Sequence, residues 1–348
     1  MIRRPPRSTP KPSSAASDVY KRQPLLQVRD LIKEFDIRDA ALRSRTLRAV
    51  DGGNFVVEKR ETFAIVGESG SGKSTIGRVL LGLTDKSSGE IIFDQEPLSI
   101  KNREHFRNIR KRLQIVFQDP VTAFDPRISI GRSLMEFLEL RDDLDKSQRQ
   151  LRVDELINEV GLDPDMVKRL PSQMSGGQLQ RLSVARALAS EPDLIFLDEP
   201  TSALDVSIRG QIVNLLMERQ QQRGVSYLLV AHDLRVVAVM ADRVAVMYLG
   251  QFVEISDKNK LFNRPLHPYT RGLIEAAHLD DLGLNREKDS VRLSGELSEN
   301  DAKSIGCRLA PRCPFVELKC NEPQQLNELS PGQFVRCWKA MDIKNKSG

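Results

Sequence analysis

An apolar run that ends in a glycine-rich loop is the feature that most constrains this chain. Residues 63–66 (Phe-Ala-Ile-Val) suit a buried strand, and residues 67–75 (Gly-Glu-Ser-Gly-Ser-Gly-Lys-Ser-Thr) match GxxxxGK[ST]. A helical pattern begins near Ser74. Glycines let such a loop curl so that its N–H groups face phosphate oxygens, and the helix N-terminus adds a favourable dipole. The sequence therefore predicts a phosphate-binding loop.

The roles of the loop residues follow from this prediction. Lys73 would reach the β- and γ-phosphates of a nucleotide, and the Ser74 hydroxyl would ligate Mg²⁺. The pattern indicates a nucleotide, although it does not indicate which kind of protein uses it. The expected nucleotide-binding residues of the loop are Gly67, Ser69, Gly70, Gly72, Lys73, Ser74 and Thr75.

Short apolar runs alternate with longer helical patterns from residue 25 onward, which predicts an α/β fold with a mainly parallel sheet. Helical patterns cover residues 179–189 and 208–222. Residues 131–175 are expected to be all-helical, and the pattern becomes irregular and richer in proline after about residue 260. Strands are expected at residues 63–66, 91–93, 114–117, 194–197, 227–230 and 244–247.

The positive charge of the chain is confined to its first residues. The 348-residue chain has a net charge of +5, which would ordinarily suggest nucleic acid or an anionic membrane as a partner. Residues 1–22 carry six Lys or Arg and one Asp, so the remaining chain is neutral. We interpret residues 1–23 as a disordered or non-native leader, similar to translated sequencing-adaptor read-through, and expect no nucleic-acid partner.

Two further motifs fit a nucleotide site. The apolar run 194–197 delivers Asp198 and Glu199, of which Asp198 would hold Mg²⁺ and Glu199 would orient or deprotonate the attacking water. Residues 175–178 begin a helix with a serine and two glycines, a second anion site. Since one chain already has one phosphate loop, this second site would serve the nucleotide of another subunit. Its residues are Ser175, Gly176, Gly177 and Gln178.

Together these motifs resemble those of the ATP-binding subunits of ABC transporters. The resemblance covers about residues 25–340, and Met174 replaces the leucine that usually precedes the signature serine. It implies an ATPase with a P-loop ABC ATPase fold, an N-terminal antiparallel β part and a helical subdomain at about residues 119–175. It also implies that Gln118 senses Mg²⁺, that His232 contacts the γ-phosphate, that Asp205 lies in the D-loop and that Phe35 stacks on adenine.

The region after residue 260 resembles the C-terminal extension of oligopeptide, dipeptide and nickel importer ATPases. The implied organisation is an ATP-binding domain at residues 24–260 and an extension at residues 261–348. The resemblance implies ATP and Mg²⁺, a second ATPase subunit in a head-to-tail heterodimer, two permease subunits and an extracytoplasmic solute-binding protein. The chain would act peripherally at the cytoplasmic face of the inner membrane, powering import of oligopeptides or dipeptides.

The four cysteines lie only in this extension, which is no secreted disulfide framework. Thiolates suit iron–sulfur clusters or zinc, and some members of the resembling subfamily carry such a cluster. We therefore expect a [4Fe–4S] cluster ahead of zinc, with four reduced thiols as the alternative. The candidate ligands are Cys307, Cys313, Cys320 and Cys337.

Other functions remain open at this point. The alternative is that the same machinery imports nickel, glutathione or another small solute. A soluble ABC ATPase of DNA repair or translation would need two cassettes or a long coiled coil between Lys73 and Ser175, and neither is present. The extension also disfavours an exporter.

Overall fold

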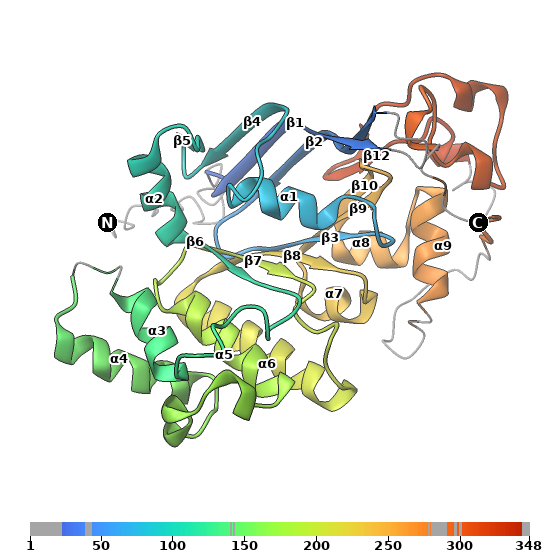
Figure 1. Cartoon of the computed structure of the whole chain (residues 1–348). Coiled ribbons are helices and arrows are strands. Elements are labelled where there is room, and N and C mark those ends of the chain that lie inside the picture. Colours follow the sequence, from blue (N-terminus) through green and yellow to red (C-terminus); the bar gives the residue numbers. More distant parts are fainter. Residues whose placement is uncertain are drawn as a thin grey trace, which may run out of the picture.

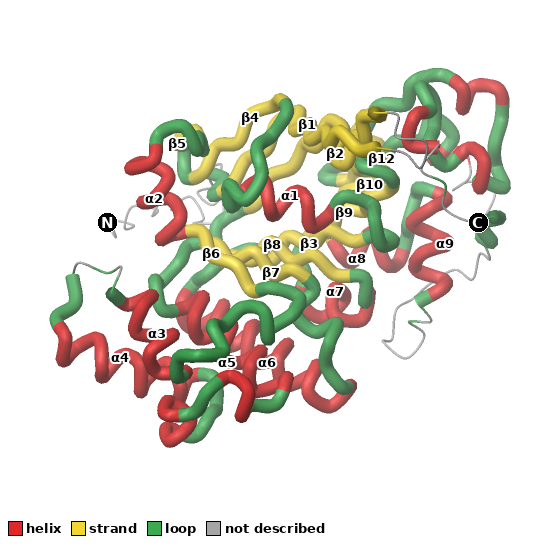
Figure 2. Tube along the Cα trace, viewed as in Figure 1, coloured by secondary structure: helices red, strands yellow, loops and turns green. Residues whose placement is uncertain are grey.

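The computed structural model describes residues 23–38, 44–139, 141, 143–277, 279, 291–295, 298 and 301–342. The predicted leader therefore lies outside the described residues, apart from Gln23. Two sheets and the helices around them make up the described chain (Figures 1 and 2). The smaller sheet is antiparallel and has the order β2-β1-β4-β5. Its strands are β1 (Leu26–Arg38), β2 (Ser44–Val57), β4 (Ser88–Phe93) and β5 (Glu96–Pro97).

The larger sheet has a parallel centre with an antiparallel extension at one side. Its order is β11-β12-β10-β9-β3-β8-β7-β6, and the pairs from β9 to β6 are parallel. The arrangement confirms the predicted α/β class with a mainly parallel sheet and an N-terminal antiparallel part. The parallel strands are β3 (Thr62–Val66), β6 (Leu113–Val116), β7 (Leu194–Asp198), β8 (Ser226–Ala231) and β9 (Arg243–Tyr248).

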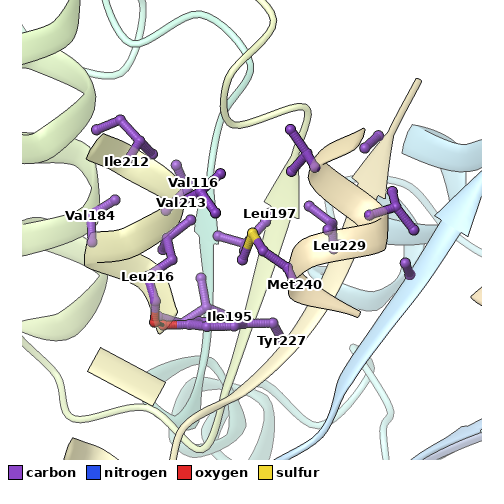
Figure 3. Close-up of a cluster of buried hydrophobic side chains, with 14 of the residues drawn as sticks. Val116, Val184, Ile195, Leu197, Ile212, Val213, Leu216, Tyr227, Leu229 and Met240 are labelled. Atoms are coloured by element: carbon purple, nitrogen blue, oxygen red, sulfur yellow. Dashed lines mark hydrogen bonds between the residues drawn. The ribbon is translucent and has the colours of Figure 1, made fainter. Parts of the chain in front are cut away.

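Alternate residues of the parallel strands face two separate cores. On β7, Ile195 and Leu197 pack with helices on one face, whereas Leu194 and Phe196 join the core that reaches the small sheet. All four are fully buried. This burial on both faces explains why the parallel strands have continuous apolar sequences. Figure 3 shows the first of these cores, where Ile195, Leu197 and Tyr227 lie with side chains such as Leu216 and Met240.

Helices cover both faces of the parallel strands (Figure 1). Helix α1 (Lys73–Leu80) packs between the two sheets through Ile76, Val79 and Leu80. The opposite face carries most of the other helices. Helix α2 (Arg103–Arg112) lies on the same side as α1, since its Ile109 joins the same core. The helices of the opposite face between residues 130 and 240 are α3 (Ile130–Leu138), α4 (Lys146–Glu159), α5 (Gly176–Leu188), α6 (Val206–Arg223) and α7 (Leu234–Met240).

The segment expected to be all-helical contains α3 and α4 followed by two 3₁₀ turns. Side-chain caps explain where these helices begin. The Ser129 side chain accepts from the Arg132 N–H, and Asp145 forms a capping box with Gln148 at the start of α4. Among the residues that the structure describes, none of the helices combines the length and apolar character needed to cross a bilayer.

The C-terminal region continues the large sheet instead of standing apart from it. Strand β12 (Gln333–Val335) pairs with β10 (Gln251–Asp257), and β11 (Asn327–Ser330) pairs with β12. Helices α8 (Lys258–Asn263) and α9 (Pro268–Ala276) follow β10 directly. In Figure 1 the red C-terminal region extends from β12 to the right of the picture, on the side of α9.

Gly77 makes the packing of α1 testable. A Cβ at this position would lie 2.1 Å from ring atoms of Phe196 on β7. We expect Gly77→Ala to lower the free energy of unfolding by about 1–3 kcal/mol, because the ring must move. Gly210→Ala in α6 is the matched control, since nothing lies within 4 Å of its Cβ. That change should raise the free energy of unfolding by about 0.5–1 kcal/mol. Urea denaturation measures both, and equal effects would contradict the described packing.

Candidate functional site

The carboxyl ends of four parallel strands deliver the predicted residues to one edge of the sheet. Strand β3 leads into the loop at residues 67–72, and β7 ends at Asp198. Strand β8 ends one residue before His232, and β6 ends two residues before Gln118. Such an edge is where open α/β sheets bind ligands. The topology therefore brings together motifs that lie up to 165 residues apart in the chain.

The glycine-rich loop needs glycine at the two positions where its backbone passes closest to neighbouring strands. Gly67 and Gly72 have φ angles of 153° and 104°. A Cβ on Gly67 would lie 2.1 Å from the Met247 carbonyl oxygen, and one on Gly72 would lie 2.0 Å from that of Ala49. Strands β9 and β2 therefore fix the course of the loop on both sides. Within the described ranges, the backbone N–H groups of Ser69, Gly70 and Gly72 donate to no protein acceptor.

The ammonium group of Lys73 lies inside the curl of this loop. Its Nζ donates to the carbonyl oxygens of Gly67 (2.9 Å) and Glu68 (2.8 Å). Lys73 is buried, and burial lowers its pKa from the usual range, against the opposing effect of the Glu199, Asp198 and Glu68 charges. A buried cation surrounded by free N–H donors fits an anionic phosphate chain.

Two oxygen atoms of the predicted magnesium residues lie in contact. Ser74 Oγ donates to Asp198 Oδ1 at 2.7 Å, which joins α1 to the end of β7. Burial raises the pKa of the Asp198 carboxyl, while Ser74 opposes that shift. Hydroxyl and carboxylate oxygens are hard ligands of the kind that Mg²⁺ takes. The residues present therefore fit a magnesium ion at this position.

Glu199 lies between the other two predicted catalytic residues. Its Oε2 accepts from Gln118 Nε2 at 3.0 Å and lies 3.0 Å from His232 Nδ1. The Glu199 backbone has a φ of 48°, which is unusual for a residue with a side chain. Its N–H donates to the Val230 carbonyl oxygen at 2.9 Å, so the strained turn is held by β8. Strain of this kind gathers at functional sites.

The predicted signature residues begin α5 and lie in a different environment. Ser175 is exposed and caps the helix, because its N–H donates to Gln178 Oε1 (2.9 Å) and its Oγ accepts from the Gln178 N–H (3.3 Å). No hydrogen bond or ion pair joins residues 175–178 to residues 67–75 in the described part of the chain. The signature residues therefore make no hydrogen-bonded contact with the phosphate loop of the same chain in the described structure.

The remaining predicted residues lie near the edges of the site. Asp205 is exposed and precedes α6, and Thr75 lies in the first turn of α1. Phe35 is half-buried on β1 and pairs with Leu47 of β2, two residues from the Ala49 carbonyl that contacts the loop. Lys33 Nζ lies 4.5 Å from the centre of the Phe35 ring.

The four cysteine side chains are free thiols in the described structure. Burial raises the pKa of Cys313 to about 11 and that of Cys337 to about 12, and the neighbouring thiols add to both shifts. In the described ranges, no three His, Cys, Asp or Glu side chains are placed to hold one metal ion. As placed, the thiols do not fit the expected cluster.

Sequence analysis missed three contacts made by the C-terminal region. Tyr269 and Arg312 form hydrogen bonds with Glu68 of the phosphate loop. Arg308 forms one with the carbonyl oxygen of Leu249, which directly follows β9. The sequence gives no signal for these contacts, because the C-terminal extension (the tail, residues 261–348) has no pattern that indicates where it packs.

Comparison with known proteins agrees with this geometry. The structure of cbiO1 of Clostridium perfringens, described as part of the ABC transporter complex cbiONQ, matches with a TM-score of 0.61 and 27% identity over 74% of this chain and 99% of that chain. The dimeric ATP-binding cassette MJ0796 bound to ADP and Pi has the same TM-score with 25% identity, over 67% and 98%. The fold and the site thus define an ATP-binding cassette ATPase.

Sequence relatives show to which branch of these ATPases the chain belongs. The ABC transporter family matches residues 50–202, and the oligopeptide/dipeptide transporter C-terminal region matches residues 253–320. YkfD of Bacillus subtilis, named as an oligopeptide transport ATP-binding protein, is 42% identical over 91% of this chain and 96% of its own length. AppF of the same species, named likewise, is 39% identical over 90% and 96%. The chain belongs to the oligopeptide/dipeptide branch of the ABC transporter ATP-binding subunits and is an ATPase that uses ATP and Mg²⁺.

Proposed function

We propose that this chain hydrolyses ATP to power an importer of oligopeptides or dipeptides. The observation that carries the proposal is the placement of Glu199 between Gln118 and His232, next to the contact of Ser74 with Asp198. The peptide substrate is supported by the match of residues 253–320 and by the names of YkfD and AppF.

The residues of the site have different roles in the hydrolysis of ATP. Lys73 and the N–H groups of the loop bind and orient the phosphates. Ser74 and Asp198 would hold Mg²⁺, which when bound supplies positive charge to the phosphate oxygens. Glu199 accepts the proton of the attacking water as general base, while Gln118 and His232 fix its carboxylate. These contacts leave the second carboxylate oxygen, Oε1, for the water.

The partners follow from the separation of the signature residues from the phosphate loop. We infer that Ser175–Gln178 contacts the nucleotide of a second ATPase subunit, in a heterodimer joined head to tail. Binding of ATP would close that dimer and its hydrolysis would open it. The ATPase dimer would dock at the cytoplasmic membrane face on two transmembrane permease subunits, which would take up this motion, and an extracytoplasmic binding protein would deliver the peptide.

Reconstitution tests this function. The tagged chain, purified from native membranes in mild detergent, should retain a second ATPase and two membrane-spanning proteins. In proteoliposomes, ATP hydrolysis should rise when a binding protein loaded with peptide is added, and nickel or glutathione should not replace the peptide. A monodisperse protein stimulated by DNA or ribosomes would defeat the proposal.

The cluster expected at the four cysteines stays a prediction for the purified protein, since the thiols as the structure places them are not arranged to hold one metal ion. If it forms, protein purified without oxygen should contain iron and absorb near 400 nm. Absence of both would indicate that Cys307, Cys313, Cys320 and Cys337 are reduced thiols, the alternative that the sequence left open.

A further inference from the structure

The C-terminal extension touches the phosphate loop at Glu68. The Glu68 backbone N–H donates to the hydroxyl oxygen of Tyr269 at 3.0 Å, across 201 residues of sequence. The Glu68 carboxylate accepts from Arg312 Nη1 at 3.3 Å. Both partners lie outside residues 50–202, which match the ABC transporter family. The loop is therefore held on one side by residues that the ATP-binding domain does not supply.

Tyr269 is rigidly placed. It is fully buried near the start of α9, and its ring centre lies 4.6 Å from that of Tyr248 on β9. The start of α9 is fixed by Glu254 of β10. This fully buried carboxylate accepts from the N–H groups of Leu266 (3.0 Å) and His267 (2.8 Å). The hydroxyl of Tyr269 is thus a fixed point against which the loop rests.

Arg312 reaches Glu68 from the cysteine-bearing segment. Its Nη1 also donates to Tyr248 Oη at 3.4 Å, and its side chain is only 11% exposed. Arg308, on the same segment, bonds to the Leu249 carbonyl oxygen and to Asp51. Gly250, which follows Leu249 in the chain, donates its N–H to the Ser71 carbonyl oxygen of the loop at 2.9 Å. The tail therefore supports the loop directly at Glu68 and indirectly at Ser71.

These contacts bear on the atoms that would bind nucleotide. The Lys73 ammonium is held by the Glu68 carbonyl oxygen, so a shift of Glu68 would move the charge that meets the phosphates. The N–H of Glu68 is already bonded to Tyr269, whereas those of Ser69 and Gly70 find no acceptor in the described ranges. Tyr269 therefore sets the direction in which the free donors point.

We propose that Tyr269 and Arg312 are positioning residues that make the C-terminal extension part of the ATP site and set its affinity for ATP. This inference rests on the proposed role of the loop in ATP binding. Because the two residues act on the loop and not on the attacking water, they affect binding of ATP and leave the chemical step intact.

The test measures the ATP dissociation constant of full-length variants by calorimetry and their KM and kcat by phosphate release. Tyr269→Phe keeps the ring and removes the hydroxyl. We expect it to raise Kd and KM by about 2- to 12-fold with kcat changed by less than about twofold, because one hydrogen bond is lost. Arg312→Ala should act in the same direction, and Arg312→Lys should restore much of the affinity.

Tyr227→Phe is the matched control. The Tyr227 hydroxyl is equally buried and donates to the Leu216 carbonyl oxygen at 2.8 Å, at the opposite end of the parallel strands. It should lower thermal stability without changing Kd. Because both positioning residues act on Glu68, the double variant Tyr269→Phe/Arg312→Ala should lose less affinity than two independent effects would predict.

The outcomes separate the two proposals. If the unmodified chain fails to bind ATP, the proposed function fails. If the unmodified chain binds ATP and folded Tyr269→Phe and Arg312→Ala bind it equally well, the positioning role is wrong. An equal rise in Kd for Tyr227→Phe would also overturn it, since the effect would then come from general loss of stability.

Discussion

Glu199→Gln should lower the rate of ATP hydrolysis by about 10²- to 10⁴-fold, the range that a positioned general base contributes. The amide has nearly the shape of the carboxylate but accepts no proton from water. Glu199 touches neither Lys73 nor Ser74 through any hydrogen bond in the described structure, so ATP affinity should change little. Single-turnover phosphate release measures the chemical step, and calorimetry measures the affinity.

The variant should also accumulate as a closed dimer when ATP and Mg²⁺ are present. Hydrolysis opens the dimer in the proposed cycle, and a subunit that binds ATP without hydrolysing it cannot complete that cycle. Light scattering after gel filtration, with the partner ATPase present, would detect the dimer. Glu218→Gln, an exposed carboxylate on α6, is the control and should behave as the unmodified chain. Unchanged turnover in Glu199→Gln would refute the general-base role.

The parts of the site that the sequence predicted are those set by local patterns. Residues 63–80 form strand, loop and helix because an apolar run, three glycines and a helical pattern follow one another. Asp198 and Glu199 were predictable because they end an apolar run. Once the strands are parallel, their carboxyl ends meet at one edge, so the joining of these residues with His232 follows from topology.

The parts that the sequence did not predict depend on contacts between distant residues. The bond of Glu68 to Tyr269 spans 201 residues, and nothing near either residue indicates the other. Strand β12 has only three residues, too few to show an alternating pattern, yet its pairing with β10 joins the tail to the large sheet. The left-handed backbone of Glu199 is likewise imposed by its hydrogen bond to Val230 and not by its own preference.

Lys73→Ala is the second large effect, and here the loss should appear in binding. Hydrogen bonds to charged groups contribute about 1.5–3 kcal/mol each, so ATP affinity should fall at least about tenfold. The buried side chain also bonds to the Gly67 and Glu68 carbonyl oxygens, and its removal frees the loop to change shape. Calorimetry with ATP and Mg²⁺ measures the affinity, and thermal melting without nucleotide measures the effect on the fold.

Lys260→Ala is the control for the loss of a lysine that bonds to a backbone carbonyl oxygen. Its ammonium also donates to a backbone carbonyl oxygen, that of Pro331 at 2.7 Å, but it lies on α8, away from the loop. This control should retain ATP affinity.

Because burial lowers the pKa of Lys73 and the phosphate charges would raise it again, ATP binding to the unmodified chain should take up protons at alkaline pH. Lys73→Ala should abolish that uptake, and a variant that binds ATP as tightly as the unmodified chain would show that Lys73 does not meet the phosphates.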